Sequence, residues 1–351
     1  MEEMQNIIRN FDVSEEIAEI LPINSGLINN TYLVKTPGES PDFILQRKNK
    51  YIFPNVPAMM DNIIKVTGHI RKKVENAGGY PTREVMTVIL TKEGLPYYID
   101  EKGEYWTMSL YIPDTISYDY AVNAELARKG GEGIGKFHKQ LEDFIGPLYP
   151  VIEGFHDLKF RFNQWDEAIK SGDRKRIEEV KEEIEWVERR RNKMEEFWKL
   201  VENGTLPKRV THNDTKLSNI LFDKKGEALC VIDLDTVMCN TPLADYGDAI
   251  RSFANTGKED DPNLDNVTLD MDKYKAYTEG YLSYVKDMLN EHELAYLPFA
   301  PQYITYEQVM RFLMDYIQND KYYKIEYPTH NLVRTRAQMK LLESMERFLI
   351  D

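Results

Sequence analysis

Residues 211–222 read THNDTKLSNILF, and residues 231–235 read VIDLD. Asp214 is followed five positions later by Asn219, and Asp233 follows an apolar segment fourteen positions after Asn219. Phosphoryl transfer from ATP needs a group that orients the attacking hydroxyl and oxygen ligands that hold magnesium on the phosphates. The spacing therefore predicts Asp214 as the proton acceptor and Asn219 and Asp233 as the metal ligands. The alternative, a surface turn before an ordinary core strand, explains a lone Asp and Asn but not the complete pattern.

The order H-x-D-x-K-x-x-N followed by I-D is that of the protein-kinase catalytic loop and its metal-binding Asp. Eleven residues separate Asp233 from Asp245 and no A-P-E element follows, so there is no room for a long activation segment. The chain resembles the aminoglycoside-phosphotransferase-like family of small-molecule kinases, and within it the N-acetylhexosamine 1-kinases. The resembling blocks are HNDTKLSNILFD (212–223), VIDLDTVM (231–238), DYGDAIR (245–251), RFLMDYIQNDKYYKI (311–325) and NLVRTRAQ (331–338), with weaker matches in INSGLINNTYLV (23–34) and FILQR (43–47).

This resemblance implies a protein-kinase-like, two-lobed α+β fold. A small antiparallel-sheet N-lobe at residues 1–111 would bind the nucleotide, and a larger, mainly helical C-lobe at residues 112–351 would carry the catalytic loop and the substrate site. The apolar patterning agrees, because strand-like segments fill the first third and helical spacing dominates afterwards. The segments expected in the first third are strands at 23–34 around a turn at Ser25-Gly26, at 43–47 and at 85–90, a hairpin of 96–99 and 105–112 with its turn at 100–103, and a helix at 57–76 that stops at Gly78-Gly79.

Two features of the helical part need interpretation. One apolar stripe predicts a single helix from about Asp173 to Asn203, with Asp173 as its N-cap. Residues 130–136, GGEGIGK, match part of a phosphate-binding loop, but Phe137 stands where a Ser or Thr should follow. We therefore expect close helix packing there.

The nucleotide site is expected in the N-lobe. Its loop holds Gly26 beside Ser25 without a run of glycines, and an ordinary hairpin remains the alternative. In the resembling kinases the next strand carries a phosphate-anchoring Lys, whereas this chain has Leu45 and Arg47 on one face of that strand. Leu45 would cover adenine and Arg47 would reach the phosphates; a surface Arg on an edge strand is the alternative. The remaining candidates are Asp61, as the acidic partner of Arg47, and Tyr111 and Ile112, as the hinge beside adenine.

Substrate residues follow mainly from the resemblance. Arg311 and Tyr322 fall where sugar-contacting residues are expected, and Phe253 is expected to stack on the sugar ring. Each has a structural role as its alternative. The further candidates are His156 and Arg161, which offer hydrogen bonds to a sugar, with solvated turn residues as the alternative. Asp235 would help to place the metal or the substrate, and Lys216 would assist at the γ-phosphate.

Composition limits the class of protein. The 351 residues include 45 Lys and Arg against 59 Asp and Glu, a formal net charge of −14, and two cysteines. An acidic surface disfavours nucleic acid and anionic membranes, and no apolar run is long enough to span a bilayer. Two cysteines are too few for a disulfide framework. We expect a cytoplasmic protein with a small-molecule sugar as its partner, existing as a monomer or weak homo-oligomer.

The predicted function is ATP- and Mg²⁺-dependent phosphorylation of a small sugar. The resemblance implies the anomeric C1 hydroxyl of N-acetylglucosamine or N-acetylgalactosamine as the acceptor and a sugar 1-phosphate as the product. A kinase of choline, homoserine, an aminoglycoside or another small metabolite is the first alternative, because an acidic cleft would suit a cation. A catalytically inactive nucleotide-binding protein is the second.

Overall fold

The computed structural model describes residues 2–23 and 28–349. The chain divides into two compact units: unit 1 holds Met1–Ser117, Gln140–Glu153 and Asn219–Met238, and unit 2 holds Tyr118–Lys139, Gly154–Ser218 and Cys239–Asp351. Neither unit is one continuous segment, which the expected ranges 1–111 and 112–351 did not anticipate. No helix in the described part of the chain combines the length and the apolar character needed to cross a membrane.

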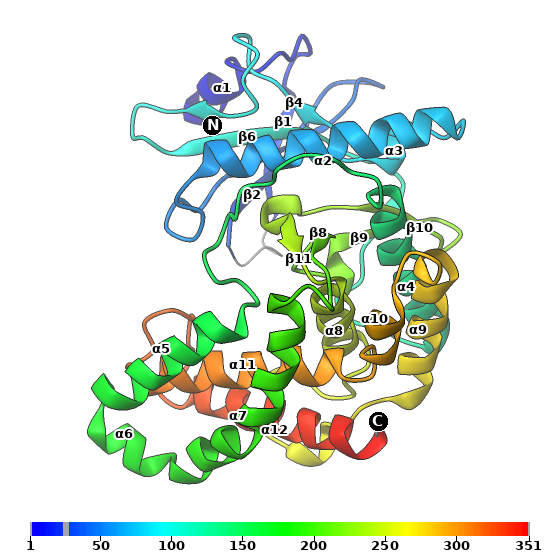
Figure 1. Cartoon of the computed structure of the whole chain (residues 1–351). Coiled ribbons are helices and arrows are strands. Elements are labelled where there is room, and N and C mark those ends of the chain that lie inside the picture. Colours follow the sequence, from blue (N-terminus) through cyan, green and yellow to red (C-terminus); the bar gives the residue numbers. More distant parts are fainter. Residues whose placement is uncertain (1, 24–27, 350–351) are drawn as a thin grey trace. The chain divides into compact units, whose positions relative to one another are not determined.

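A six-stranded antiparallel sheet forms the frame of unit 1 (Figure 1). Its order is β1-β2-β3-β6-β4, and β5 also pairs with β6. The predicted hairpin turn is confirmed, since Asp100 Oδ1 accepts the N–H groups of Lys102 and Glu104 and Gly103 has φ 72°. The strands are β1 (Glu19–Ile23), β2 (Asn30–Lys35), β3 (Phe43–Arg47), β4 (Val88–Ile89), β5 (Tyr98–Ile99) and β6 (Tyr105–Leu110).

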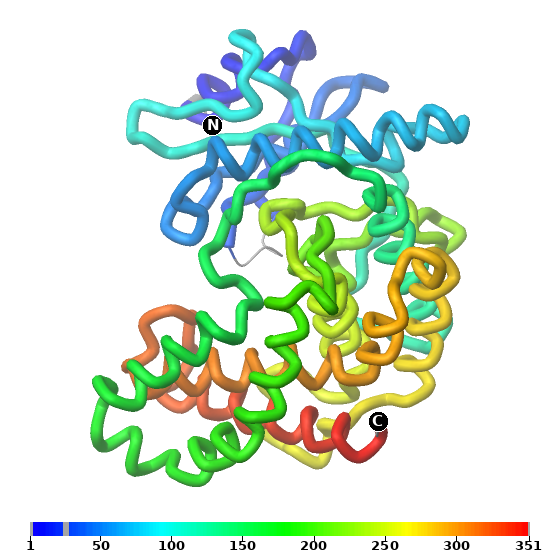
Figure 2. Tube along the Cα trace, in the orientation of Figure 1, coloured from blue at the N-terminus to red at the C-terminus, as the bar shows by residue number. Residues whose placement is uncertain are grey.

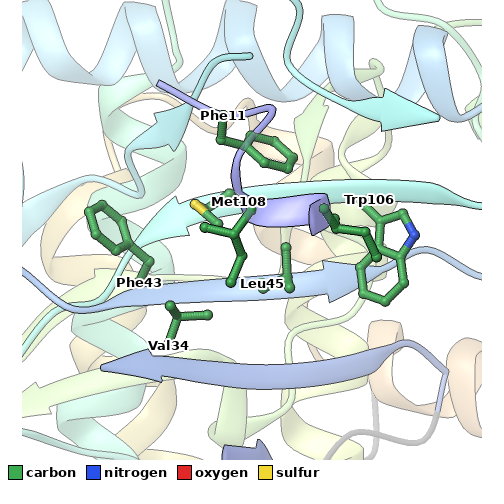
Figure 3. Close-up of a cluster of buried hydrophobic side chains, with 8 residues drawn as sticks. Phe11, Val34, Phe43, Leu45, Trp106 and Met108 are labelled. Atoms are coloured by element: carbon green, nitrogen blue, oxygen red, sulfur yellow. The ribbon is translucent and has the colours of Figure 1, made fainter. Parts of the chain in front are cut away.

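One face of this sheet carries an apolar core (Figure 3). Leu45 on β3 lies opposite Met108 on β6, and both side chains are buried together with Phe11. Phe11 follows the short helix α1 (Glu2–Ile8), whose Ile7 and Ile8 join the same cluster. The core therefore occupies the face of β3 that carries Leu45.

The predicted helix at 57–76 is confirmed as α2 (Val56–Asn76). Asn55 caps it, accepting the N–H of Ala58 at 3.1 Å, and the chain leaves it through Gly78 at φ 73°. A glycine tolerates this left-handed conformation without the steric cost of a side chain. The short helix α3 (Pro81–Glu84) follows.

A second, three-stranded sheet completes unit 1. It has the order β10-β9-β7, with β7 (Thr115–Ile116), β9 (Ile220–Asp223) and β10 (Ala228–Val231). Thr115 pairs with Asp223, so the segment after residue 111 and the strands after the catalytic loop belong to the same unit. This pairing places residues 112–117 in unit 1 and explains why the predicted boundary differs from the observed one.

Helices build unit 2 around α11 (Ala300–Ile317), nearly all of whose side chains are buried. Helix α12 (His330–Phe348) runs alongside α11, as the orange and red segments show in Figure 2. Helices α5 and α8 also pack on α11. The other helices of this part are α4 (Ala124–Gln140), α5 (Leu158–Ser171), α6 (Arg174–Glu179), α7 (Lys181–Glu202), α8 (Pro242–Phe253), α9 (Met271–Val285) and α10 (Glu291–Ala295). The strands β8 (Arg209–Thr211) and β11 (Met238–Asn240) pair with each other, and the 3₁₀ turns are η1 (Leu217–Asn219) and η3 (Leu264–Asn266). A further 3₁₀ turn, η2 (Leu234–Thr236), lies in unit 1.

The prediction of one helix from Asp173 to Asn203 is wrong. The backbone of Val180 leaves the helical region, at φ −119° and ψ 28°, and separates α6 from α7. Val180 is also fully buried, so its side chain stays in the core while the chain turns. The predicted cap is confirmed, because Asp173 Oδ1 accepts the N–H groups of Lys175 and Arg176 at 3.0 Å.

The glycine-rich segment 130–136 lies inside α4 and serves helix packing, as predicted. A Cβ atom on Gly131 would stand 2.2 Å from the carbonyl oxygen of Tyr277 on α9, and one on Gly280 would stand 2.1 Å from that of Arg128. Such distances are far below van der Waals contact, so only glycine lets α4 and α9 approach this closely.

Candidate active site

Asp245 on α8 holds the backbone of the loop that carries Asp214. Asp245 Oδ2 accepts the N–H of His212 at 2.7 Å and Oδ1 that of Asn213 at 2.6 Å, and His138 on α4 contacts Oδ2 at 2.7 Å. Burial alone would raise the pKa of Asp245, but its bonds to His138 and to the loop backbone outweigh burial and lower it. The buried carboxylate is therefore charged, and its two oxygens fix the backbone just before Asp214.

A second carboxylate on α8 fixes the residue after Asp214. Asp248 Oδ2 accepts the N–H of Thr215 at 3.1 Å, and the hydroxyl of Thr215 donates to the carbonyl of Asp245 at 2.6 Å. Asp214 itself is partly exposed and forms an ion pair with Lys216 at 3.0 Å. The structure thus brings the two predicted catalytic side chains into contact on a loop whose backbone is anchored on both sides.

Asn219 and Asp233, the predicted metal ligands, lie at the same end of the β9–β10 hairpin in unit 1. The N–H of Ile232 donates to the carbonyl of Asn219 at 2.9 Å, and Val231 pairs with Ile220. Asp233 adopts the left-handed conformation, at φ 59° and ψ 53°. Strained backbone in a residue other than glycine persists where the surrounding structure holds it, often at functional sites. One carboxylate and one amide suit Mg²⁺, which takes few protein ligands and completes its shell with water and phosphate.

The structure gives β3 a different outward face from the one predicted. Leu45 is fully buried in the core beneath α1, so it cannot cover adenine. Arg47 is exposed and donates to Asn30 at 2.8 Å. The strand therefore turns the side of Leu45 and Arg47 away from the face that carries Lys48, one residue further on. Ser25 and Gly26, predicted for the nucleotide loop, lie outside the described residues.

Lys48, which sequence reasoning missed, forms a buried ion pair in unit 1. Its Nζ lies 2.7 Å from Oδ1 and 2.8 Å from Oδ2 of Asp235, and it also donates to Gln46 at 2.7 Å. Asn29 donates to Oδ2 of the same carboxylate at 2.7 Å. Asp235 was predicted to face the substrate or the metal, but both of its oxygens are engaged by Lys48 and Asn29. A charge this deeply buried needs such a partner.

The remaining nucleotide-site candidates are placed as follows. Asp61 pairs with Lys65 one turn further along α2, at 2.7 Å, and not with Arg47. The reason is helical geometry, since residues four apart share a face. Tyr111 donates its N–H to the carbonyl of Asp42, and Ile112 is buried beside it. Tyr111 and Ile112 follow β6 directly, and their nucleotide role stays a prediction.

Three of the predicted substrate residues gather around one carboxylate in unit 2. Glu307 on α11 lies 2.7 Å from Nδ1 of His156 through Oε2 and accepts from Arg161 at 3.0 Å through Oε1. Arg311, one helical turn later, acts on the same carboxylate electrostatically. Burial would raise the pKa of Glu307, but His156, Arg161 and Arg311 lower it to about 2. The carboxylate is thus ionised and faces three cationic groups.

Aromatic rings surround the guanidinium of Arg311. Its Cζ atom lies 5.7 Å from the ring centre of Phe155, 5.9 Å from that of Tyr322 and 5.6 Å from that of Tyr323. Asp315 on α11 shapes the segment that carries the two tyrosines, accepting N–H groups of Lys321, Tyr322 and Tyr323 at 2.8 to 2.9 Å. Tyr322 itself is exposed. The structure therefore brings Tyr322 to Arg311, and the substrate role of both residues stays a prediction.

Phe253 does not belong to this cluster. It is 1% exposed, its ring lies edge-on to Tyr277 at 5.0 Å, and a Cβ atom on Gly130 would overlap it. The expected stacking of Phe253 on a sugar is wrong, because the ring fills the core between α4, α8 and α9.

Sequence reasoning missed the buried groups that pair with the candidate residues inside each unit: Lys48 in unit 1, and His138, Asp245, Asp248 and Glu307 in unit 2. Asp245 and Asp248 lie in the apolar segment of α8, and Glu307 lies in the apolar segment of α11. A carboxylate in an apolar helical segment must be paired when it is buried. That pattern was visible in the sequence, but the partners were not.

Comparison with known proteins identifies the family of the chain and supports its fold. The model of the phosphotransferase enzyme family (APH) matches residues 19–281. The structure of a microcompartment-associated aminopropanol kinase is similar at a TM-score of 0.69 and 17% identity, covering 97% of this chain and 96% of that chain. A spectinomycin phosphotransferase in complex with ADP and spectinomycin has a TM-score of 0.60 at 12% identity, with 99% and 98% covered. The Plasmodium vivax ethanolamine kinase has a TM-score of 0.55 at 14% identity, with 95% and 83% covered. The predicted protein-kinase-like α+β fold is confirmed; at these identities the likeness shows the fold alone.

Proposed function

Because the chain belongs to the phosphotransferase enzyme family, we propose that it phosphorylates an N-acetylhexosamine with ATP at the anomeric C1 hydroxyl. Asp214 takes the proton of the attacking hydroxyl. Lys216, whose Nζ lies 3.0 Å from the carboxylate of Asp214, contacts the transferred phosphoryl group in this proposal. The loop backbone, held by Asp245 and Asp248, keeps the carboxylate of Asp214 in place during the transfer. The product is the sugar 1-phosphate.

Asn219 and Asp233 would hold Mg²⁺. An ion held there would supply positive charge to offset the negative charge of the ATP phosphates. On the protein side, we assign the cation of the nucleotide site to Lys48 in place of Arg47, because the ammonium of Lys48 points to the face of β3 opposite the α1 core. Tyr111 and Ile112 remain the residues proposed beside adenine.

The charge around Glu307, where His156, Arg161 and Arg311 gather, is the observation that favours an N-acetyl sugar as the acceptor. Arg161, Arg311 and His156 surround Glu307, so three cationic groups act on this one carboxylate and positive charge is in excess around it. An ammonium group would be repelled there, whereas the carbonyl and hydroxyl oxygens of an N-acetyl sugar accept hydrogen bonds from guanidinium groups. The exposed ring of Tyr322 beside Arg311 offers an apolar surface to the face of a sugar.

A kinase of a cationic amino alcohol or antibiotic is the second candidate. The formal net charge of −14 favours it, since an acidic protein attracts cations over a distance. The positive charge at Arg311 favours the uncharged N-acetyl sugar instead. This charge outweighs the net charge of the protein, because nearby charges are screened less by salt than distant ones. An inactive nucleotide-binding protein is disfavoured, because Asp214, Asn219 and Asp233 are all present.

A coupled ADP-release screen tests this proposal. The acceptors are N-acetylglucosamine, N-acetylgalactosamine, the parent hexoses, choline, ethanolamine, homoserine and kanamycin, with the Asp214→Asn protein as the control for contaminating kinases. We expect turnover with an N-acetylhexosamine and a phosphorus NMR doublet from coupling to the anomeric proton. A 6-phosphate, or turnover with the cationic acceptors alone, would reject the proposal.

A further inference from the structure

We propose that His156 is a positioning residue, and that one face of α11 sets the catalytic loop through it. The inference rests on the proposed phosphoryl transfer at Asp214, and it does not depend on which acceptor is used. His156 was predicted to contact the substrate, but its ring is buried and both of its nitrogens are engaged within the protein.

His156 joins α11 to the catalytic loop by two hydrogen bonds. Nδ1 lies 2.7 Å from Glu307 Oε2, and Nε2 lies 3.1 Å from the carbonyl oxygen of Asn213, the residue before Asp214. The carbonyl of His156 in turn accepts the hydroxyl of Tyr303 at 2.9 Å. Tyr303 and Glu307 are four residues apart and share one helix face, so α11 holds the ring and the backbone of His156 together.

The same helix face continues to Arg311, again four residues further. The residue proposed to bind the acceptor and the residues that hold His156 therefore stand on one rigid element, α11. Helices position functional groups more accurately than loops do. A shift of α11 would move Arg311 and Asn213 together.

The contacts of the ring require a charged imidazole. A carboxylate and a carbonyl only accept hydrogen bonds, so both ring nitrogens must donate, and only the imidazolium donates from both. His212 and His330 differ, because Nδ1 of each accepts a backbone N–H at 3.2 Å. Burial lowers the pKa of His156, but Glu307 and then Asp248 outweigh burial and raise it above its usual range, while Arg161 and Arg311 lie around Glu307.

Both joined residues are held in the left-handed backbone region, His156 at φ 55° and Asn213 at φ 66°. Such a conformation costs a residue other than glycine free energy, and persists only where other contacts enforce it. The hydrogen bond between the His156 ring and the Asn213 carbonyl joins the two, so loss of the imidazole would let the loop backbone relax next to Asp214.

His156→Gln and Glu307→Gln test the assignment, with His330→Gln as the matched control. His330 is also buried and its Nε2 lies 3.0 Å from Asp260, but the hydrogen bonds of its ring go to Asp260 and Glu326, away from the catalytic loop. Steady-state kinetics are measured with whichever acceptor the ADP-release screen identifies, or with water as acceptor if none does. Misplacing a catalytic group by about 1 Å can cost about 10²-fold. We therefore expect kcat of His156→Gln to fall about 10²-fold while KM for ATP changes less than about twofold.

Long-range ¹⁵N–¹H NMR of the histidine rings supplies a readout that needs no turnover. We expect His156 to be an imidazolium at pH 7 in the native protein and to lose its proton in Glu307→Gln, with the alkaline limb of kcat moving to lower pH in that variant. A neutral His156 in the native protein would overturn the inference, as would a kcat of His156→Gln above a third of the native value. An equal loss in His330→Gln would also overturn it. Turnover of an acceptor other than a hexosamine would reject the proposed function and leave this inference standing.

Discussion

The ammonium of Lys48 lies 2.7 Å from Oδ1 of Asp235, and the two side chains are 3% and 7% exposed. The pair joins β3 to the turn after Asp233 across 187 positions of sequence. It places a cation on the face of β3 opposite the α1 core, and it occupies the carboxylate of Asp235 that sequence reasoning assigned to the metal or the substrate.

Lys48→Met should lower the free energy of unfolding by about 3–5 kcal/mol, because it leaves the buried Asp235 carboxylate without its cationic partner. It should also weaken ATP binding. Arg47→Met is the matched control, since Arg47 is exposed and should cost no more than about 0.5 kcal/mol. Urea unfolding and titration calorimetry with ATP measure the two effects. If Arg47→Met weakened ATP binding as much as Lys48→Met does, Arg47 would again be the candidate for the nucleotide-site cation.

Asp214→Asn should lower kcat by about 10²–10⁴-fold, the usual contribution of a general base, while ATP binding stays nearly unchanged.

Asp233→Ala should instead remove the magnesium dependence of ATP binding, because this carboxylate is the proposed metal ligand. Calorimetry with ATP in the presence and absence of magnesium separates the two variants. A magnesium dependence that survives in Asp233→Ala would exclude the metal role.

Arg311→Ala should raise the acceptor KM about tenfold or more, as expected for lost hydrogen bonds to a charged group, with KM for ATP little changed.

Phe253→Ala should affect the stability of the fold and not the acceptor KM, because the ring is buried in the core. It should destabilise the fold by about 3–5 kcal/mol through the cavity it leaves, without a selective effect on the acceptor. Thermal unfolding and acceptor titrations of both variants decide the point, and a selective rise in acceptor KM in Phe253→Ala would return this ring to the substrate site.

Gly131→Ala should destabilise the protein by about 1–3 kcal/mol, the usual cost of overpacking, because the new Cβ would meet the backbone of α9. Gly68→Ala in α2 is the matched control. It has no neighbouring atom within 4 Å of a Cβ and should stabilise the helix by about 0.5–1 kcal/mol. Chemical unfolding of both variants measures this difference. If Gly131→Ala were as stable as the native protein, α4 and α9 would not be in such close contact.

The stability that His156 contributes should depend on pH. Its pKa is raised in the folded protein, so the folded state holds the proton more tightly than the unfolded state does. The contribution is complete below the ordinary pKa of about 6.5 and is lost as the pH rises through the raised value. The difference in unfolding free energy between the native protein and His156→Gln should therefore shrink above neutral pH. A difference that grows with pH would show the opposite sign of the shift.

Local spacing alone was enough for the features that lie within one short segment. The motifs that contain Asp214, Asn219 and Asp233 carry the family resemblance, and that resemblance implied the kinase-like fold, which the family match and the fold comparison confirm. The helix at 57–76, the turn at Asp100 and the packing role of the glycines in α4 were predicted for the same reason: helix periodicity, turn chemistry and small residues act over a few neighbouring positions.

Tertiary structure decided which distant groups meet. The face of β3 changes with a shift of one residue, because strand side chains alternate, so only packing against α1 could show that Leu45 is buried and that Lys48 faces the other way. Asp235 lies far in sequence from Lys48, and His156 links Glu307 to Asn213. The sequence marks these carboxylates as needing partners, since an unpaired buried charge is too costly to keep. It does not say which partner each receives, because that choice depends on how helices and strands from distant segments pack together.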